Sequence, residues 1–213
     1  MSLYVPSHFA VSDRAAIARL MHDHPFATLV TPCAPDPFVT HLPLLLVPGC
    51  EPHGILLGHV ARANPHWERA GEAESIAIFH GPHAYVSPSW YGEPAKAVPT
   101  WNFTAIHAHG VLEIVDDPVE ARGILDALVQ RFEAERENPW HFAMPAPQRD
   151  ALVRAIVAFR MRIRRITAKF KLSQNRPAGD RERVATALER EPYPEAASVA
   201  AWMRDYSIEP RSG

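Results

Sequence analysis

The chain has 213 residues, 47% of them hydrophobic and 22% charged, which is typical of a globular protein and not of a disordered or fibrous one. Its formal net charge of −2 gives no general attraction for nucleic acid or an anionic membrane, so DNA binding would need a local basic patch. No run approaches the roughly 18 apolar residues of a membrane span, and no secretory signal pattern opens the chain, so we expect a cytoplasmic protein.

The first third of the chain predicts one helix followed by short strands. Ser12 and Asp13 are typical of a helix start and Pro25 of its end, which predicts a helix over about 13–23. Clusters of proline and glycine then separate three β-like runs, which are residues 26–31, 38–47 and 55–60.

The middle of the chain continues as strands and then changes to helices. Residues 74–80 and 83–86 are predicted as strands joined by a turn at Gly81-Pro82, and residues 100–115 as one long strand. An apolar stripe predicts an amphipathic helix over 118–137, and a second helix is expected over about 146–157.

The last third predicts one long strand and two short helices. Apolar residues alternate with basic ones from Phe159 to Leu172, but the alternation slips by one residue at Arg164-Arg165, which indicates a β-bulge. We expect a single domain over 1–213, mainly β with peripheral helices (α+β), built on an antiparallel barrel of about six strands. A helical C-terminal extension would cover about 177–206.

The segment from Gly58 to Trp67 is a candidate phosphate site. Asn64 is a favoured N-cap and Pro65 suits the first helical position, so free N–H groups would point outward there. With Arg62 and His59 close by in sequence, these groups would form an anion cradle. An ordinary capped helix with a surface arginine explains the same residues.

Two further segments combine rings or polar groups in ways that suit a flat ligand. Tyr85, Trp90 and Trp101 occur among prolines and hydroxyl residues and not at core spacing, although packing over a barrel end would also account for them. Residues 168–177 collect Lys171, Ser173, Gln174 and Asn175 at the end of a strand, where a solvated polar turn is the alternative.

Together these segments resemble the PaiB-type family of FMN-binding negative transcriptional regulators, within the flavin-binding split-barrel superfamily. The resemblance spans nearly the whole chain and rests on six motifs in order, which are residues 1–9, His41-Leu-Pro43, Gly58 to Trp67, Phe79 to Tyr91, Pro99-Thr-Trp-Asn-Phe103 and Lys171-Leu-Ser-Gln-Asn-Arg176.

The resemblance implies an antiparallel split β-barrel of Greek-key type that forms a homodimer, with FMN in a groove between the subunits. By motif position it also implies the residues that contact the cofactor, which are His41, Leu42, His59, Val60, Arg62, Asn64, Trp101, Asn102, Lys171 and Gln174. The family name implies repression of transcription, yet no helix-turn-helix pattern with a basic recognition helix is present. The six basic residues between Arg160 and Lys171 are more typical of the outer face of a strand.

Two other classes of function stay open. Related split barrels include pyridoxamine phosphate oxidases and flavin reductases, so an FMN-dependent oxidoreductase is the main alternative, with His83, Tyr85 and His107 as candidates for proton transfer. Haem or metal handling is a minor alternative, because His107 and His109 project from one face of a strand. No metal site is predicted from these two histidines or from Cys33 and Cys50, which form no C-x-x-C pair.

Overall fold

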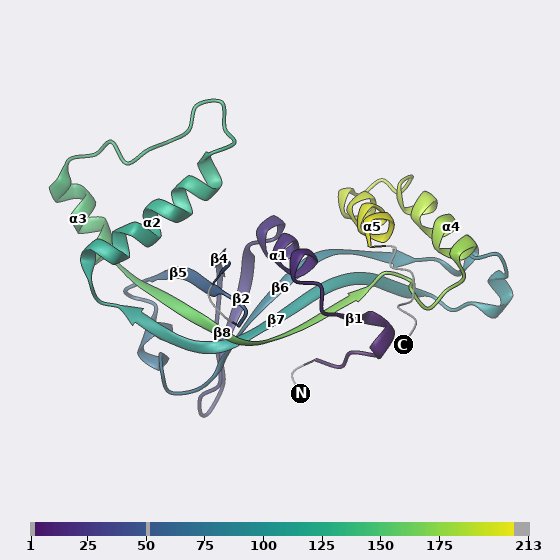
Figure 1. The fold of residues 1–213 in the computed structure, drawn as a ribbon, viewed down its shortest axis with the longest axis horizontal. Helices are drawn as coiled ribbons and strands as arrows, with labels where there is room; N and C mark the ends of the chain where they lie inside the picture. Colours follow the sequence, from purple (N-terminus) through teal and green to yellow (C-terminus); the bar gives the residue numbers. More distant parts are fainter. Residues whose placement is uncertain (1–2, 50–51, 207–213) are drawn as a thin grey trace. The chain divides into compact units, whose positions relative to one another are not determined.

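The computed structural model describes residues 3–49 and 52–206, so Cys50 and the first two residues of the N-terminal motif lie outside the described part of the chain. Its strands form one sheet in the order β3-β2-β6-β7-β8-β5-β4, with β1 paired to β8 (Figure 1). The pairings of β1 with β8, β2 with β3 and β6, and β5 with β4 and β8 are all antiparallel. The strands are β1 (Ala10–Val11), β2 (Phe26–Thr31), β3 (Phe38–Pro43), β4 (Leu45–Val47), β5 (Ile55–Ala61), β6 (Ser75–Val86), β7 (Thr100–Val115) and β8 (Ile156–Lys171).

Five α-helices accompany this sheet in the described residues. The predicted first helix is confirmed, because the Asp13 carboxylate accepts the backbone N–H of Ala15 at 2.9 Å and caps the N-terminus. The two predicted tail helices are also confirmed. The helices are α1 (Arg14–Asp23), α2 (Pro118–Glu133), α3 (Ala146–Arg154), α4 (Ala178–Leu188) and α5 (Pro194–Asp205), and short 3-10 turns lie at Ser7–Phe9 (η1), Pro65–Arg69 (η2), Pro88–Trp90 (η3) and Pro94–Lys96 (η4).

The predicted turn at Gly81-Pro82 is wrong, because β6 runs without interruption from Ser75 to Val86. A proline cannot donate a ladder hydrogen bond, so it is tolerated only where one edge of the strand has no partner for its N–H. The pairing of β2 with β6 covers residues 76–78 only, which leaves that edge of β6 without β2 further along.

The predicted change of phase in the last long strand is confirmed. Along β8, Phe159, Met161 and Ile163 are buried, and then Ala168 and Phe170, so the buried face moves by one residue between the two sets. The second predicted helix ends earlier than expected, at Arg154, because residues 156–162 pair with β5.

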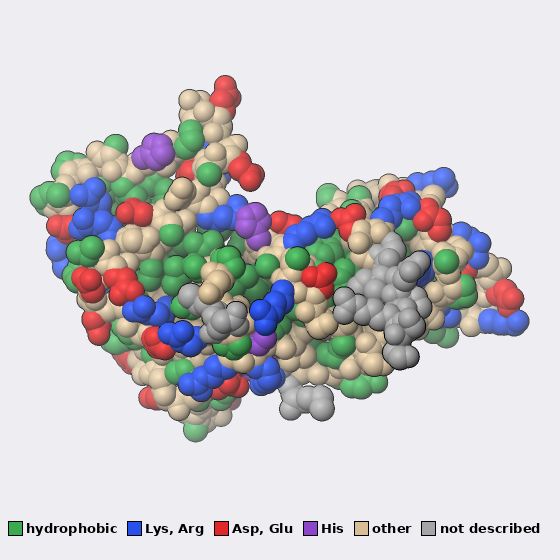
Figure 2. All heavy atoms as spheres, viewed as in Figure 1, with side chains coloured by type: hydrophobic (Ala, Val, Ile, Leu, Met, Phe, Trp, Pro, Cys, Tyr) green, Lys and Arg blue, Asp and Glu red, His purple; other side chains and the backbone are tan. Residues whose placement is uncertain are grey.

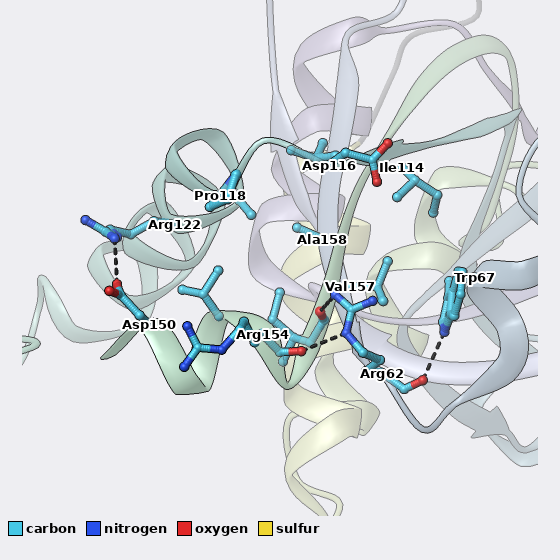
Figure 3. Close-up of a pocket in the computed structure, with 14 residues that line it drawn as sticks. Arg62, Trp67, Ile114, Asp116, Pro118, Arg122, Asp150, Arg154, Val157 and Ala158 are labelled. Atoms are coloured by element: carbon cyan, nitrogen blue, oxygen red, sulfur yellow. Dashed lines mark hydrogen bonds and ion pairs between the residues drawn. The ribbon is translucent and has the colours of Figure 1, made fainter. Parts of the chain in front are cut away.

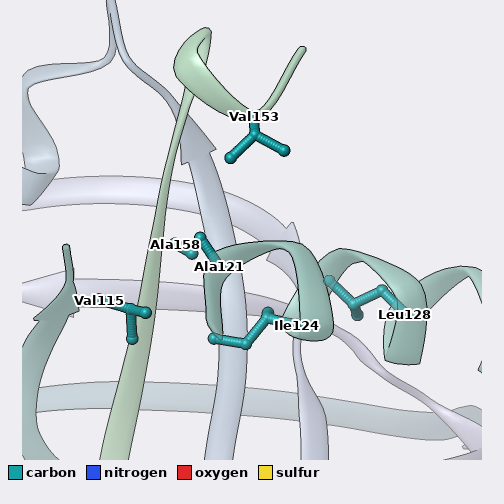
Figure 4. Close-up of a cluster of buried hydrophobic side chains, with 6 residues drawn as sticks. All are labelled: Val115, Ala121, Ile124, Leu128, Val153 and Ala158. Atoms are coloured by element: carbon teal, nitrogen blue, oxygen red, sulfur yellow. The ribbon is translucent and has the colours of Figure 1, made fainter. Parts of the chain in front are cut away.

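The chain divides into two compact units. The first contains the described residues of 3–17, 80–106 and 167–206, and the second those of 18–79 and 107–166. In the second unit, α2 and α3 bury an apolar cluster against β7 and β8 (Figure 4), which consists of Val115, Ala121, Ile124, Leu128, Val153 and Ala158. The mainly antiparallel sheet with peripheral helices confirms the predicted fold class, while the single domain stays a prediction.

None of the helices in the described ranges is both long enough and apolar enough to cross a membrane.

Candidate functional site

The turn after β5 is held by a buried polar network in the second unit. Asn64 caps η2 as predicted, since its Oδ1 accepts the backbone N–H of His66 at 3.0 Å. Its Nδ2 donates to the Thr40 hydroxyl of β3 at 3.2 Å, and the two His66 ring nitrogens lie 2.7 Å from Thr40 Oγ1 and 2.8 Å from Thr31 Oγ1. Burial lowers the pKa of His66, so the ring is neutral in this network. The Asn64 side chain therefore positions the turn.

Arg62 fastens the same turn to the end of α3. The Arg62 Nε donates to the carbonyl oxygen of Arg154 at 2.7 Å, and Nη2 donates to that of Ile156 at 2.8 Å. The backbone N–H of Arg62 donates to the carbonyl oxygen of Ala155 at 2.8 Å. The last carbonyls of a helix have no partner within the helix and carry partial negative charge, so a guanidinium stabilises them. We call this arrangement the Arg62 staple.

The predicted anion cradle is smaller than the sequence suggested. η2 is a single 3-10 turn of five residues, and Asn64 already takes the N–H of His66. Arg62 gives two of its five N–H groups to the carbonyls of the staple. The other three have no partner in the part of the chain that the structure describes.

The other predicted residues of the second unit divide between surface and core. His41 is exposed on β3, with its Nδ1 3.1 Å from the Thr28 hydroxyl, whereas Leu42 and Val60 are buried. His59 is half-buried, and its Nδ1 is shielded from solvent without a hydrogen-bond partner in the described residues. Burial lowers the pKa of His59, which keeps the ring neutral.

A pocket of about 410 Å³ opens beside the Arg62 staple (Figure 3). Arg62 and Trp67 stand at one end of it, where the Trp67 Nε1 donates to the Arg62 carbonyl at 3.0 Å. An ion pair of 2.9 Å between Arg122 and Asp150 stands at the other end. All the residues that line this pocket belong to the second unit.

The first unit carries an exposed group of rings on β6 and β7. Trp101 is 53% exposed, and its ring centroid lies 6.1 Å from that of Tyr85 and 6.2 Å from that of His83. The His83 Nε2 lies 3.1 Å from a carboxylate oxygen of Glu195 on α5. We call Trp101, Tyr85 and His83 the aromatic platform.

Lys171 lies beside this platform. Its ammonium donates to the Thr100 hydroxyl at 2.7 Å and to the Trp101 carbonyl at 2.5 Å, so two of its three N–H groups are used. Burial, and then the nearby cations Lys169 and Arg176, lower the pKa of Lys171.

The remaining two predicted residues hold the chain after β8. Asn102 is fully buried, and its Nδ2 donates to Ser173 Oγ at 3.0 Å. Gln174 accepts from the Leu172 N–H at 2.7 Å and donates to the Phe170 carbonyl at 2.6 Å. Ser173 has a φ of 65°, which is rare outside glycine, and these bonds hold it there. Asn102 and Gln174 therefore shape the turn.

The structure thus brings the ten predicted residues together in two groups, six in the second unit and four in the first. Sequence reasoning missed Glu195 and Arg154, because no local pattern shows which surface residue a distant helix brings near. It also missed Thr40 and His66, although the cap at Asn64 was a signal for a nearby polar network.

The histidine pair on β7 has a crowded environment. His109 is 2% exposed, and its Nδ1 lies 3.0 Å from the Arg165 guanidinium and 3.6 Å from the Glu74 carboxylate. Burial is the main cause that lowers the pKa of His109, and Arg165 adds to it. The described residues contain no group of three or more potential metal ligands.

Comparison with known proteins agrees with the motifs. A family model described as "Putative FMN-binding domain" matches residues 3–165. The chain is 33% identical over 205 residues to "Protease synthase and sporulation protein PAI 2" of Bacillus subtilis (strain 168), which covers 95% of this chain and 97% of that protein.

Solved structures show the same fold. The FAD and heme binding protein from Mycobacterium smegmatis has a TM-score of 0.61 at 18% identity, covering 81% of this chain and 78% of that one. The flavocytochrome Anf3 from Azotobacter vinelandii has a TM-score of 0.59 at 16% identity, covering 78% of this chain and 72% of that one. The predicted split-barrel fold is confirmed by these structures. The predicted cofactor, FMN, is confirmed by the family model, which describes an FMN-binding domain. The chain belongs to the FMN-binding family that matches residues 3–165, the PaiB-type family that its motifs indicated.

Proposed function

We propose that this protein binds FMN as a homodimer in the cytoplasm and acts as a PaiB-like negative regulator of transcription. The observation that carries flavin binding is the aromatic platform, because three rings gather at the surface around Trp101, which is 53% exposed. Stacking on such rings is a favourable way to hold a flat heterocycle.

The side chains around the platform fit the chemistry of FMN. Lys171 keeps one N–H for a carbonyl or ring nitrogen of the ligand. Within the second unit by itself, the shielded Nδ1 of His59 has no hydrogen-bond partner among the described residues, and a hydrogen bond to a ligand would remove the free-energy cost of leaving it unpaired. When bound, FMN supplies hydride and electron transfer, and the protein contributes orientation.

Different predicted residues have different parts in this proposal. Within the first unit we assign direct contact to Trp101 and Lys171, and within the second unit to His41, since these side chains are at least partly accessible. Arg62, Asn64, Asn102 and Gln174 are positioning residues, because their side chains hold the two turns that carry the motifs. Leu42 and Val60 are buried, so they would support from behind the strands that carry His41 and His59.

Regulation of transcription is supported by the relative in Bacillus subtilis, whose name links it to protease synthesis and sporulation. The basic stretch of β8 gives little support for direct DNA contact. Arg160 is paired with Glu120 at 2.9 Å and Arg165 with Glu74 at 3.5 Å. Basic and acidic side chains are also mixed on the face seen in Figure 2. A protein partner therefore fits these charges better than a DNA backbone.

An FMN-dependent oxidoreductase is the second candidate, and the His83–Glu195 pair favours it. A histidine held at 3.1 Å by a carboxylate beside a flavin platform is placed to move a proton during hydride chemistry. The regulator has no need of such a pair. Steady oxidation of NADH or NADPH by the FMN-loaded protein would favour this candidate.

The test begins with the purified full chain. We expect a yellow protein that is a dimer by light scattering and that releases FMN on denaturation. A colourless monomer that takes up no added FMN would refute the proposal of flavin binding. For the regulator, promoter DNA or a purified candidate protein partner should bind the FMN-loaded and the flavin-free protein with different affinities. Identical affinities would contradict regulation by FMN.

A further inference from the structure

Another pocket, also of about 410 Å³, lies between the second half of α2 and the loop that leads from α2 to α3. Figure 1 shows this loop as the long connection between the two helices. All of the lining comes from residues 126–142, so one continuous stretch within the second unit forms the whole pocket. The ten residues that the motifs assign to the cofactor lie outside this stretch. The pocket therefore has no part in the function proposed above.

Two aromatic rings of the loop belong to the lining of this pocket. The ring centroids of Trp140 and Phe142 lie 4.7 Å apart, and the two ring planes meet at 70°. Trp140 is 47% exposed, so much of its ring surface is open to a ligand. Aromatic rings attract cations over their faces, and tryptophan does so most strongly. These rings thus suit a positively charged group with an apolar exterior.

The last turn of α2 holds the loop in place. Glu133 Oε2 accepts the backbone N–H of Trp140 at 3.0 Å, and Glu133 Oε1 lies 3.2 Å from Arg136 Nε. Because the bond to Trp140 uses the backbone N–H, it does not depend on the side chain at position 140. The Glu133 carboxylate therefore keeps the rings of the loop beside the helix.

The face of α2 that lines the pocket is acidic. Asp126, Gln130 and Glu133 are four and then three residues apart, which puts their side chains on one side of the helix. Within the described ranges the lining contains no lysine or arginine, and it includes one histidine, His141. Arg136 compensates part of the charge of Glu133, whereas the exposed Asp126 carboxylate has no basic partner in the part of the chain that the structure describes. The charge that a ligand meets in this pocket is thus negative.

We propose that this pocket binds a small organic cation that carries an alkylated ammonium group. The charged nitrogen lies against the Trp140 ring, the Asp126 carboxylate compensates its charge, and the alkyl groups contact Phe142 and Val129. An ammonium whose hydrogens are replaced by alkyl groups suits this wall, because the rings offer no hydrogen-bond acceptor. This ligand is additional to the flavin, and its binding does not rest on the function proposed above.

Choline is a suitable probe, with 3,3-dimethylbutan-1-ol as its uncharged counterpart of the same shape. The readout is the ¹H signal of the three equivalent methyl groups of each compound, titrated with the full chain at pH 8, where histidine is neutral. We expect a saturable upfield shift of the choline signal, because protons over the face of an aromatic ring are shielded, and about tenfold weaker binding of the alcohol. Equal affinity for the two compounds would overturn the proposal. Displacement of choline by Mg²⁺, beyond the effect of NaCl at the same ionic strength, would also overturn it, since the carboxylates would then bind a metal ion.

Substitutions in the pocket supply the second test. Trp140→Ala should weaken choline binding by about tenfold, and Trp140→Phe should recover most of the affinity. Asp126→Asn should weaken it by about threefold. Glu135→Gln is the matched control, since Glu135 is an exposed carboxylate of the same stretch that does not line the pocket, and it should leave the affinity within about 1.5-fold. Unchanged binding in Trp140→Ala would refute the site.

The flavin content of the same samples is measured by absorbance. Displacement of choline by added FMN would place the pocket in the flavin site and overturn the proposal. Choline binding by a protein that takes up no FMN would contradict the proposed function alone. An FMN-loaded dimer that binds no choline would contradict the organic-cation site alone.

Discussion

The substitution Arg62→Ala distinguishes two possible roles of this arginine, which are holding the turn after β5 and contacting the phosphate of FMN. The Arg62 staple makes two charge-assisted bonds, of 2.7 Å to the carbonyl of Arg154 at the end of α3 and of 2.8 Å to that of Ile156 at the start of β8. Because Arg62 is exposed and water can reach the two carbonyls when they are left unpaired, we take about 1 kcal/mol for each bond, below the usual range for a bond to a charged group, and so about 2 kcal/mol for both. For a domain of this size that corresponds to a fall in Tm of roughly 4–8 °C.

The assay is thermal unfolding of the flavin-free protein, followed by titration with FMN and with riboflavin. Arg62→Ala should lower Tm by this amount and weaken both ligands by the same factor, since the turn is disturbed and no phosphate contact is lost. Arg69→Ala is the control, because the exposed Arg69 side chain pairs with Glu72 at 3.7 Å, and it should change the free energy of unfolding by less than about 0.5 kcal/mol. An unchanged Tm, together with weaker binding of FMN but not of riboflavin, would refute the structural role of the Arg62 staple and support a phosphate contact.

Three further predictions concern packing, pH and chemistry. Gly58→Ala should lower the free energy of unfolding by about 1–3 kcal/mol, because the new Cβ would lie 2.9 Å from the Phe159 ring. Gly123→Ala is its control, since no atom lies within 4 Å of the new Cβ, and chemical denaturation should show it to be neutral or stabilising. The pKa of His66 is lower in the folded than in the unfolded protein, so the unfolded state binds more protons and stability should fall as the pH drops below about 6.5. A smaller fall in stability in His66→Gln would confirm that His66 causes this pH dependence, and an identical fall would contradict it. His83→Gln should slow NAD(P)H oxidation by the FMN-saturated protein by at least about tenfold, and equal rates at saturating FMN would exclude proton transfer by His83.

Much of the fold could be predicted because its signals are local. The cap at Asp13 and the change of phase in β8 each depend on a few neighbouring residues, and both are confirmed. The turn expected at Gly81-Pro82 failed for a reason that is not local. A proline fits a strand when the neighbouring strand has ended, and only the pairing of β2 with residues 76–78 shows where that happens.

The motifs of the candidate site predicted positions better than the directions of side chains. The cap at Asn64 was predicted correctly, but the partners of Arg62 lie more than 90 residues away in the sequence, at the junction of α3 and β8. Asn102 likewise bonds to Ser173, which only the packing of distant segments brings near. Residue type and spacing showed that these segments matter, whereas the tertiary contacts decide which side chains hold a turn and which remain accessible.

The central claim is that the aromatic platform binds the flavin ring, and an FMN titration of Trp101→Ala tests it most directly. Trp101 is 53% exposed, so nearly half of its surface is buried, and Trp101→Ala should cost about 2–3 kcal/mol and lower Tm by roughly 4–12 °C, so the titration is made well below that Tm. The loss of stacking should weaken FMN and riboflavin alike by about tenfold, while Trp101→Phe should recover most of the affinity. Wild-type affinity for FMN in Trp101→Ala would contradict the claim.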